Sequence, residues 1–282
     1  MKLAGAYPIR LVCRLLGMPR SSVYYQHHSD YGDSEAMLKT ALLDLAAECP
    51  TFGYRRLTIM MQRLGWRVNS KRVRRWMDEL GLSGVQPKRT TFTTDSRHSF
   101  PRYPNLVKDL NITHPDQVWV GDITYIRLPR EFVYLAILMD VFTRAIRGWH
   151  LGRNLDHSLS LAALERALVV AVPEIHHSDQ GVQYAATGYV ERLKGLGVEP
   201  SMAAVGKPED NPFAERVIRT IKEEEVYLSD YRDYHDALTQ IGPFLDDVYN
   251  RKRIHSALGY LTPREFEEQW REERSRRTTT RT

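Results

Sequence analysis

The stretch QVWVGDITYIRLPREFVYLAILMDVFTRAIRGWHL, residues 117–151, decides the fold of this chain. Its first part alternates apolar and polar side chains and is rich in β-branched and aromatic residues, which predicts a strand over 117–128. The segments 131–140 and 142–151 have the same character, and a tight turn is expected near 140–143. We therefore expect three consecutive strands.

Helices alternate with short strands after residue 151. We expect short strands over 174–179, before a glycine-containing turn, and over 198–202. Helices are expected over the following segments, the first of which begins at Ser158: 158–171, 187–197, 211–224, 234–251 and 262–274. Strands that come first and then alternate with helices predict an α/β fold with a mixed sheet flanked by helices.

The stretch NPFAERVIRTIKEE, residues 211–224, has two stripes when it is drawn as a helix. Five apolar side chains between Phe213 and Ile221 share one face, which predicts that this face is buried. Glu215, Arg219 and Lys222 share a narrow stripe beside it. A surface ion pair between a Glu and an Arg four residues later would explain much of that stripe, at roughly 0.2–0.5 kcal/mol.

Three carboxylates stand where their surroundings predict none. Asp122 interrupts an apolar strand, Asp179 ends a strand before a turn, and Glu215 lies on the helix just described. A divalent metal would explain all three, because Mg²⁺ takes a few carboxylate oxygens and leaves its other positions to water and phosphate. Two such ions about 4 Å apart can hold the attacking and leaving oxygens of a phosphoryl transfer.

Each of these carboxylates also has an ordinary explanation. Asp122 could lie at a strand edge or cap a neighbouring element, and Asp179 could simply form a turn. Glu215 could pair with Arg219. The residues alone leave both interpretations open.

Other potential metal ligands are weaker candidates. Asp140 could be a further ligand, although its place before a turn favours a role in that turn. His176 and His177 could bind metal, but they fit the end of a strand better. Cys13 and Cys49 have no paired spacing, so we expect two reduced thiols of a cytosolic protein and no zinc site.

The positive charge is concentrated in the first part of the chain. Residues 1–113 contain 18 Lys and Arg against 9 Asp and Glu, a net charge of +9, whereas residues 114–282 contain 22 against 26, a net charge of −4. Within residues 51–90 the count is 10 basic to 2 acidic residues. Such a block fits a polyanion such as DNA, although a solvated basic face of an ordinary helix has the same composition.

Short helices are predicted throughout this basic region. One covers IRLVCRLLG, residues 9–17, and another covers 33–50, with Asp33 or Ser34 as its cap and Pro50 as its end. The longest apolar run of the chain is too short to span a bilayer. Basic residues inside the first apolar stretch make a signal peptide an unlikely interpretation.

Two further helices, over 53–65 and 70–80, are joined by the turn GWRVNS and are similar to a helix-turn-helix. Asn69 or Ser70 can cap the second helix. That helix has an apolar side and carries four basic residues: Lys71, Arg72, Arg74 and Arg75. A recognition helix needs this division, with one face to pack and the other to meet phosphates and base edges, although other helical hairpins share it.

The spacing of the acidic residues resembles that of a known family. Between Asp122 and Asp179 lie 56 residues, and between Asp179 and Glu215 lie 35. This pattern resembles the DDE signature of transposases and retroviral integrases. The words WVGDITYI, HSDQGVQY, EDNPFAERVIRTIKEE and YNRKRIHSALGYLTPREF resemble the second-reading-frame (OrfB) transposases of bacterial insertion sequences. The segments 53–82 and 13–25 resemble the DNA-binding part and the usual opening of those proteins, so the resemblance covers nearly the whole chain.

The resemblance implies a ribonuclease H-like catalytic core in which Asp122, Asp179 and Glu215 are the catalytic residues and metal ligands. It implies two Mg²⁺ ions as cofactors, with Mn²⁺ as a substitute. Together with the sequence patterns it divides the chain as follows: 1–32 N-terminal helical segment, 33–90 helix-turn-helix-like DNA-binding domain, 91–113 linker, 114–272 ribonuclease H-like integrase catalytic core, and 273–282 disordered tail.

The resemblance also implies DNA contacts near the acidic residues. A Lys or Arg seven residues after the Glu contacts DNA near the reacting end in this family, and that position is Lys222 here. Arg219 lies between the two on the same stripe, and Asn211 matches the family's Asp-Asn pair and is expected to contact DNA or to hold the active-site loop. Gly121 departs from the Thr that the family often has, and the loop before Asn211 lacks the usual aromatic residue.

The activity implied is metal-dependent DNA strand cleavage and strand transfer at the ends of a bacterial insertion sequence, that is, DNA transposition and integration. Water would cut a phosphodiester and free a 3′-hydroxyl, which would then attack another DNA phosphate. The resemblance implies a copy-out, paste-in route through a circular intermediate. It also implies that the partners are double-stranded DNA and an upstream-frame protein joined by a frameshift fusion, and that the chain forms a homo-oligomer on DNA. It implies no membrane association and a location in the bacterial cytoplasm at the nucleoid. The absence of a His-His-Cys-Cys zinc domain favours the bacterial type over retroviral integrases.

Two other functional classes remain open from sequence alone. A DNA-binding regulator or inactive remnant would bind DNA without cutting it, and the intact set of three acids speaks against it. A ribonuclease H-like hydrolase without strand transfer would cut RNA–DNA hybrids or flaps and join nothing. The basic region over 51–90 speaks mildly against this second class.

Overall fold

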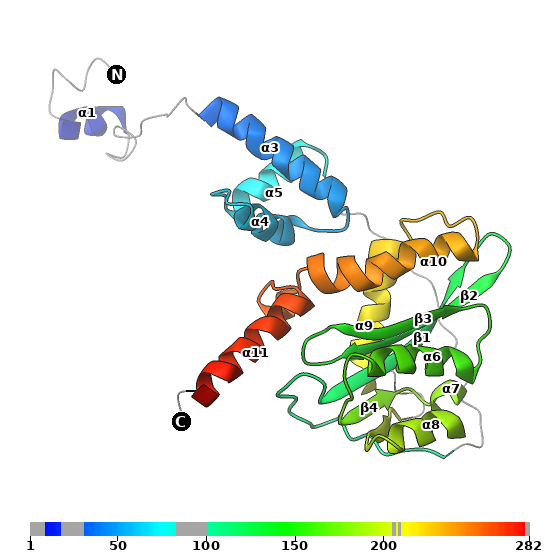
Figure 1. Cartoon of the computed structure of the whole chain (residues 1–282). Coiled ribbons are helices and arrows are strands. Elements are labelled where there is room, and N and C mark those ends of the chain that lie inside the picture. The colour runs from blue at the N-terminus through cyan, green and yellow to red at the C-terminus, as the bar shows by residue number, and fades with distance from the viewer. Residues whose placement is uncertain (1–8, 18–30, 83–100, 205–206, 208–209, 280–282) are drawn as a thin grey trace. The chain divides into compact units, whose positions relative to one another are not determined.

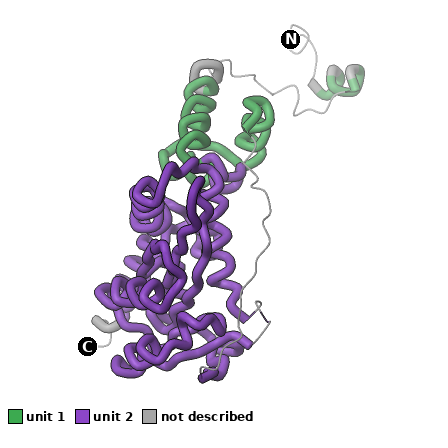
Figure 2. The backbone as a smooth tube through the Cα atoms, turned by 90° about the vertical axis from the view of Figure 1, so that its right-hand side faces the viewer, with its two compact units in different colours: residues 1–49, 57–83 green, residues 50–56, 84–282 purple. Residues whose placement is uncertain are grey.

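A computed structural model of the chain describes residues 9–17, 31–82, 101–204, 207 and 210–279. Its contacts divide the chain into two compact units (Figure 2). The smaller unit contains residues 1–49 and 57–83, and the larger contains residues 50–56 and 84–282. Within the described ranges, no helix has both the length and the apolar character needed to cross a membrane.

In the residues that the structure describes, the smaller unit contains helices and no strand. Its elements are α1 (Ile9–Leu16), α3 (Tyr31–Glu48), α4 (Tyr54–Arg63) and α5 (Ser70–Glu79), of which α4 starts in the segment assigned to the larger unit. The apolar stripe of α3 is buried, and α5 buries Trp76 completely. The expected cap of α3 is wrong: the helix begins at Tyr31, so Asp33 and Ser34 lie inside its first turn.

The larger unit is built on one five-stranded sheet (Figure 1). The order across the sheet is β3-β2-β1-β4-β5, so that β1 lies at its centre. β2 pairs antiparallel with β1 and β3, whereas β4 pairs parallel with β1 and β5. The strands are β1 (Val118–Arg127), β2 (Phe132–Asp140), β3 (Ile146–Gly152), β4 (Ile175–Ser178) and β5 (Glu199–Met202). This mixed sheet confirms the ribonuclease H-like α/β architecture expected from sequence.

Helices cover both faces of the sheet, and each face has its own apolar core (Figure 1). One core is shared with α6 (His157–Leu168), α7 (Val182–Ala185) and α8 (Thr187–Lys194). The other is shared with the helical elements of the last third of the chain: α9 (Pro212–Ile221), η3 (Lys222–Val226), α10 (Tyr234–Pro243) and η4 (Phe244–Lys252). A short 3₁₀ turn, η5 (Ser256–Leu258), precedes the C-terminal helix α11 (Pro263–Thr279).

The alternation of side chains along β1 decides which face receives each residue. Val118 and Val120 belong to the core on the α9 side, whereas Trp119 belongs to the core on the α6 side. Because successive side chains of a strand point to opposite faces, Asp122 is directed to the α9 side and Gly121 to the α6 side. A polar residue in the apolar strand is therefore aimed at one helix.

Close contact between β3 and α6 depends on a glycine. A Cβ atom on Gly148 would lie 2.3 Å from the carbonyl oxygen of Ala163 and 2.7 Å from the Cβ and backbone nitrogen of Ala167. Most of these atoms belong to the backbone of α6, so a side chain could be accommodated only by moving the helix away from the sheet.

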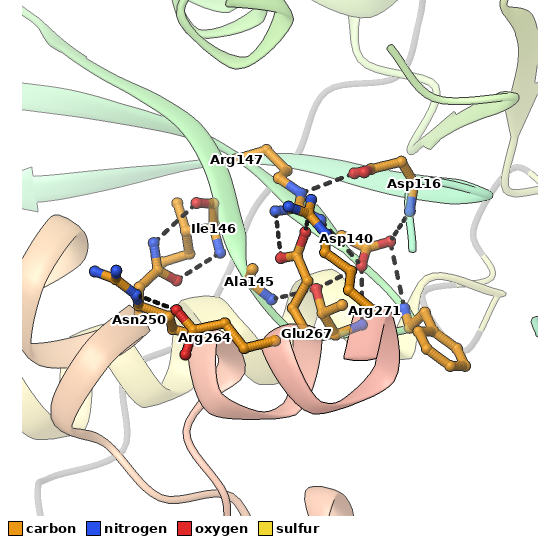
Figure 3. Close-up of polar contacts among 12 residues, drawn as sticks. Asp116, Asp140, Ala145, Ile146, Arg147, Asn250, Arg264, Glu267 and Arg271 are labelled. Atoms are coloured by element: carbon orange, nitrogen blue, oxygen red, sulfur yellow. Dashed lines mark hydrogen bonds and ion pairs between the residues drawn. The ribbon is translucent and has the colours of Figure 1, made fainter. Parts of the chain in front are cut away.

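A buried ion cluster attaches α11 to the sheet (Figure 3). Arg147 of β3 donates to Asp116 Oδ1 through Nε and to Glu267 Oε2 through Nη1, both at 2.8 Å. Its Nη2 lies 3.7 Å from Asp140 Oδ2, which is an ion pair without a hydrogen bond. Asp140 itself accepts hydrogen bonds from Asp116 N at 3.0 Å and from both Thr143 N and Oγ1, so it organises the turn as the sequence favoured.

Several expected boundaries differ from the structure. Asp156, not Ser158, caps α6, because its carboxylate accepts from the backbone N–H groups of Ser158 and Leu159. Residues 182–185, expected as a turn, form the short helix α7. The disordered tail expected over 273–282 is wrong for 273–279, which continue α11, and 280–282 lie outside the described residues.

The predicted linker 91–113 also needs correction. Its first part, 91–100, lies outside the described residues. Its second part packs on the larger unit, where Val107, Leu110 and Ile112 lie against the core on the α9 side. Leu106 N also donates to Ser201 Oγ at 2.9 Å, so this part of the chain is a component of the core unit.

Candidate active site

Asp122 and Asp179 are neighbours because of the register between β1 and β4. In this parallel pair Gly121 is opposite Ser178, so the next residue on each chain is Asp122 and Asp179. Residues at the same register position point to the same face of a sheet, here the face covered by α9. Asp179 follows directly after the end of β4, and its Oδ1 accepts from Gly181 N at 2.9 Å, which fixes the turn.

Glu215 is brought to this place by α9. The apolar stripe of α9 packs against the sheet, as expected, through Ala214, Val217, Ile218 and Ile221. Glu215 lies in the first turn of the helix and is exposed. Asn211, just before the helix, donates from Nδ2 to the carbonyl oxygen of Gly121 at 3.4 Å, which links the start of α9 to the residue next to Asp122.

The three carboxylates act on one another electrostatically. Loss of hydration around its carboxyl group, and then the charges of Asp179 and Glu215, raise the pKa of Asp122 to about 8. A hydrogen bond from Ile123 N at 2.8 Å and the charge of Lys222 act in the opposite direction. The site is therefore a region of negative potential that a divalent cation would relieve.

The donors present fit a hard divalent cation, because all three are carboxylates. In the parts of the chain that the structure describes, however, no three His, Cys, Asp or Glu side chains are already arranged as a metal-binding group. Three like charges repel one another, so their side chains would have to turn toward an ion for all three to bind it.

A buried hydroxyl group beside the acids was missed by sequence reasoning. Tyr184 of α7 is only 4 % exposed, and its hydroxyl has no hydrogen-bond partner among the described residues. Burial, then Tyr189 and the charges of Asp122 and Asp179, raise its pKa well above the ordinary value. A Cβ on Gly121 would lie 3.1 Å from the Tyr184 ring, which explains why glycine occupies the position where a Thr was expected.

The polar stripe of the helix at 211–224 divides into separate parts. Among the described residues no ion pair joins Glu215 to Arg219, so the ordinary explanation of the stripe is wrong. Arg219 is exposed, whereas Lys222 is only 7 % exposed. The ammonium group of Lys222 lies 4.8 Å from the centre of the Tyr125 ring, and burial lowers its pKa while the charge of Asp122 raises it.

Asn211 and the two adjacent histidines have structural roles. Asn211 is 5 % exposed and its Nδ2 donates to β1, which fits the role of holding the loop, and its contact with DNA stays a prediction. His176 bonds through Nε2 with the Tyr189 hydroxyl at 2.9 Å. His177 bonds with Ser201 Oγ at 2.8 Å and with the carbonyl oxygen of Asp210 at 3.1 Å. Both imidazole rings therefore hydrogen-bond to residues packed around the end of β4.

The basic helix α5 keeps most of its predicted DNA-binding residues on the surface. Asn69 caps it by accepting from Arg72 N at 2.9 Å, as the sequence predicted. Lys71, Arg74 and Arg75 are exposed. Arg72 is more enclosed: its guanidinium lies 4.5 Å from the centre of the Trp76 ring and pairs with Glu35 of α3 at 3.2 Å, and its contact with DNA stays a prediction.

Comparison with known families gives two assignments. Residues 112–208 and 196–263 match models of the integrase core domain, and residues 34–90 match a model of an HTH-like domain. The first two ranges contain all three candidate acids, and the third contains the basic helix α5.

Similar proteins come from bacterial insertion elements. The chain is 33% identical to an uncharacterized 31 kDa protein of insertion element IS600 from Shigella sonnei, over 92% of this chain and 98% of that one. It is 30% identical to the transposase of IS629 from the same species, over 94% and 93% of the two chains. Among solved structures, the HTLV-2 integrase catalytic core domain in complex with magnesium is 16% identical over 55% of this chain and 97% of that chain, with a TM-score of 0.44.

Proposed function

The chain belongs to the bacterial insertion-sequence transposases with an integrase core, and on that premise we propose that Asp122, Asp179 and Glu215 catalyse the cutting and joining of DNA strands at the ends of such an element. DNA transposition and integration are the general activity of this family. The observation that supports the proposed site is the register of β1 and β4, which brings Asp122 and Asp179 side by side on the face covered by α9, the helix that carries Glu215.

The three carboxylates are proposed to hold two Mg²⁺ ions, or Mn²⁺ in their place. When bound, these ions would supply positive charge that stabilises the phosphoryl group in transfer. The sheet holds Asp122 and Asp179 at the same register position, and α9 adds Glu215 from the covering layer. Asp122 lies within β1 and Asp179 directly follows β4, so the sheet can orient the reacting phosphate with little rearrangement of the backbone.

The reaction proposed has two steps at phosphorus. Water attacks a phosphodiester at the element end, the P–O3′ bond breaks, and a free 3′-hydroxyl remains on the element strand. That hydroxyl then attacks a phosphate of another DNA segment, and the P–O bond on the far side of that phosphate breaks. No covalent bond to the protein is required, so no Ser, Tyr or Cys nucleophile has to be identified.

Cationic side chains would guide DNA to this site. Lys222 lies beside Asp122 and is proposed to contact the phosphate next to the reacting bond. Arg219 is exposed on α9 and is proposed to contact the backbone further along the strand. Lys71, Arg74 and Arg75 of α5 are proposed to bind DNA separately, through the smaller unit.

Several features of the biological context are also proposals. The two ends of an element must be brought together, which favours a homo-oligomer on DNA. A fusion with an upstream-frame protein, made by ribosomal frameshifting, would supply recognition of the ends. A circular intermediate would form when the freed 3′-hydroxyl of one end attacks a phosphate at the other end. An enzyme acting on bacterial DNA would work in the cytoplasm at the nucleoid.

The test uses purified protein and a supercoiled plasmid that carries the DNA flanking the gene. We expect nicked and end-joined products with Mg²⁺ and none with EDTA. Asp122→Asn, Asp179→Asn and Glu215→Gln should each remove both products. Glu191→Gln is the matched control, because it removes the same charge from an exposed position on α8.

Other outcomes would identify the alternatives. DNA binding without either product, from the chain alone and from the fused form, would indicate a regulator and contradict the proposal. Metal-dependent cleavage of RNA–DNA hybrids without joined DNA would indicate a hydrolase. Products that persist in the Glu215→Gln variant would show that the site has been placed incorrectly.

A further inference from the structure

A cavity of about 210 Å³, open to solvent, lies along one face of α9. Phe213, Arg216, Val217 and Thr220 line it from the helix, at the i, i+3, i+4, i+7 spacing of a single face. Glu215 is absent from this lining and lies on another face. We name the cavity the arginine pocket after the basic residues in its wall: Arg56, Arg144, Arg216, Arg253 and His255.

The arginine pocket carries more positive than negative charge. Glu224 accepts from Arg253 Nε and Nη2, both at 2.7 Å, and from Arg56 Nη1 at 3.1 Å, with all three residues in the larger unit. This one carboxylate neutralises one of the four guanidinium groups. Within the described part of the chain, Arg144 and Arg216 form no ion pair with a carboxylate, so a surplus of positive charge faces the cavity.

A second cavity next to the arginine pocket does not cancel its excess of positive charge. It shares Arg56 and Arg216 with the arginine pocket and adds Glu223 to the wall. Glu223 is half-buried, but within the described residues it forms no ion pair with either arginine. An anion from outside the chain would therefore meet guanidinium groups that are still able to donate hydrogen bonds.

Arg144 is held in place at an energetic cost to the backbone. Its φ angle is 64°, in the left-handed region where Gly or Asn would be less strained. Its guanidinium group lies 4.1 Å from the centre of the Phe213 ring, which orients it over α9. Keeping an arginine at a position that favours glycine suggests that the side chain itself has a use.

His255 reports the electrostatic potential of the cavity. Burial, followed by the charges of Arg253 and the other three arginines, lowers its pKa to about 2. The ring is therefore neutral, and its Nε2 lies 3.2 Å from Arg253 Nη1, from which it can accept a hydrogen bond. The arginine charges that add to this lowering would also attract an anion.

We propose that the arginine pocket binds a backbone phosphate of DNA, at a position separate from the three acids. The proposal rests on the proposed function, because that function supplies DNA as the ligand. A strand that crosses α9 would present one phosphate near Glu215 and Arg219 and another to the adjacent helix face with Arg144 and Arg216. Guanidinium groups suit this task, since they bind phosphate through two parallel hydrogen bonds and carry no preference for base sequence.

The direct test is protection of single arginines from chemical modification. The full-length protein would be treated with phenylglyoxal, alone and with saturating duplex, and the modified peptides identified by mass spectrometry. We expect an element-end duplex and a random-sequence duplex both to protect Arg144 and Arg216. Arg166 of α6, which pairs with Asp246 of η4 and does not line the pocket, is the control and should react equally in every sample.

Three results of this test would overturn the proposal. Arg144 and Arg216 that stay reactive under saturating DNA would show that no DNA reaches the pocket. Equal protection by inorganic phosphate at the same phosphate concentration would indicate a site for small anions instead of DNA. Protection by the element-end duplex alone would overturn the sequence-independent contact proposed here.

A pair of variants provides the second test. Replacing Arg144 and Arg216 by Gln should weaken binding of a random duplex about three- to tenfold and make the slope of log affinity against log salt shallower by about 0.9, as for one lost phosphate contact. The matched control replaces Arg166 and Arg192, exposed and paired arginines on α6 and α8, and should leave both values unchanged. An equal loss in the control would contradict the proposal.

Failure of the pocket and failure of the active site are distinguishable. Glu215→Gln should bind duplex normally and cut nothing, whereas the arginine-pocket variant should bind weakly and keep Mg²⁺-dependent cutting at saturating protein. Normal cutting by Glu215→Gln would overturn the proposed active site but would not affect the conclusion that the arginine pocket binds DNA. Unchanged binding by the arginine-pocket variant would overturn the pocket alone.

Discussion

Replacing Arg147 by Met should destabilise the larger unit far more than the loss of an ordinary ion pair. Arg147 donates to Asp116 and Glu267 and forms an ion pair with Asp140 (Figure 3). The side chains of these partners are 17%, 11% and 0% exposed, respectively. Burial lowers the pKa of Arg147, but the hydrogen bond with Glu267 and the nearby carboxylates outweigh it, and the pKa is raised.

The size of the effect follows from burial. Removing one partner of a buried pair leaves the other charge uncompensated, which costs about 3–5 kcal/mol of unfolding free energy. Met keeps most of the volume and the apolar stem, so the loss is mainly electrostatic. Arg264→Met is the matched control, because Arg264 pairs with Glu268 on the exposed side of α11, with side chains 54% and 58% exposed, and should cost roughly 0.3–0.5 kcal/mol.

Hydrogen exchange in increasing urea, followed by mass spectrometry, measures this effect where it occurs. The chain has two compact units, so a single global transition would mix their stabilities. Amides of β3 and α11 should lose protection at lower urea in Arg147→Met. Adding Glu267→Gln to that variant should restore part of the loss, since it removes a buried charge. Equal effects of Arg147→Met and Arg264→Met would refute the reasoning.

Three further predictions concern packing, pH and the buried hydroxyl group. Gly148→Ala should destabilise the larger unit by about 1–3 kcal/mol or more in urea unfolding, because the new Cβ would lie 2.3 Å from the Ala163 carbonyl oxygen; an unchanged midpoint would contradict the close approach. Burial and then His177 lower the folded-state pKa of His176 to about 3. The stability that the neutral ring contributes is therefore complete above the unfolded pKa near 6.5 and falls by about 1.4 kcal/mol per pH unit below it. In His176→Asn the unfolding free energy should fall less steeply between pH 6.5 and 5, and the same slope as in the unmodified protein would contradict this. Tyr184→Phe should keep stability or raise it by about 1 kcal/mol, because it removes a buried hydroxyl that has no partner among the described residues; lower stability would show that the hydroxyl has a partner.

The sequence predicted the sheet and the candidate acids because both depend on local patterns. The strands over 117–151 follow from alternation and β-branched composition, and the structure places β1, β2 and β3 there, with β3 beginning after a longer turn. Asp122 is recognisable as a polar residue within an apolar strand, and Asp179 as a carboxylate at the end of a strand before a turn. Their position on one face then follows from the parallel register of β1 and β4.

The sequence could not predict which polar side chains are enclosed by tertiary contacts. Lys222 shares a stripe with Arg219 on a helical wheel, yet the ring of Tyr125 and the edge of the acidic site enclose it. Asn211 turns to β1, and Arg72 pairs with Glu35 of α3, because partners distant in sequence compete with solvent for their polar groups.

The arginine pocket could not be predicted from the sequence either, because it too depends on tertiary contacts. Its guanidinium groups come from the start of α4, the turn after β2, α9 and the segment after η4, which are separated by many residues in the chain. The motif at 249–266 supports the resemblance to the family. Its sequence does not predict that Arg253 forms an ion pair with Glu224, whereas Arg144 and Arg216 do not pair with any described carboxylate.

The claim that three carboxylates form one metal site is tested most directly by anomalous diffraction from crystals soaked in Mn²⁺. We predict a peak in contact with Asp122 and Asp179, with Glu215 turned toward it, and loss of that peak in crystals of Asp122→Asn. The account would be contradicted if active protein showed no peak at Asp122, or showed its peak at other residues.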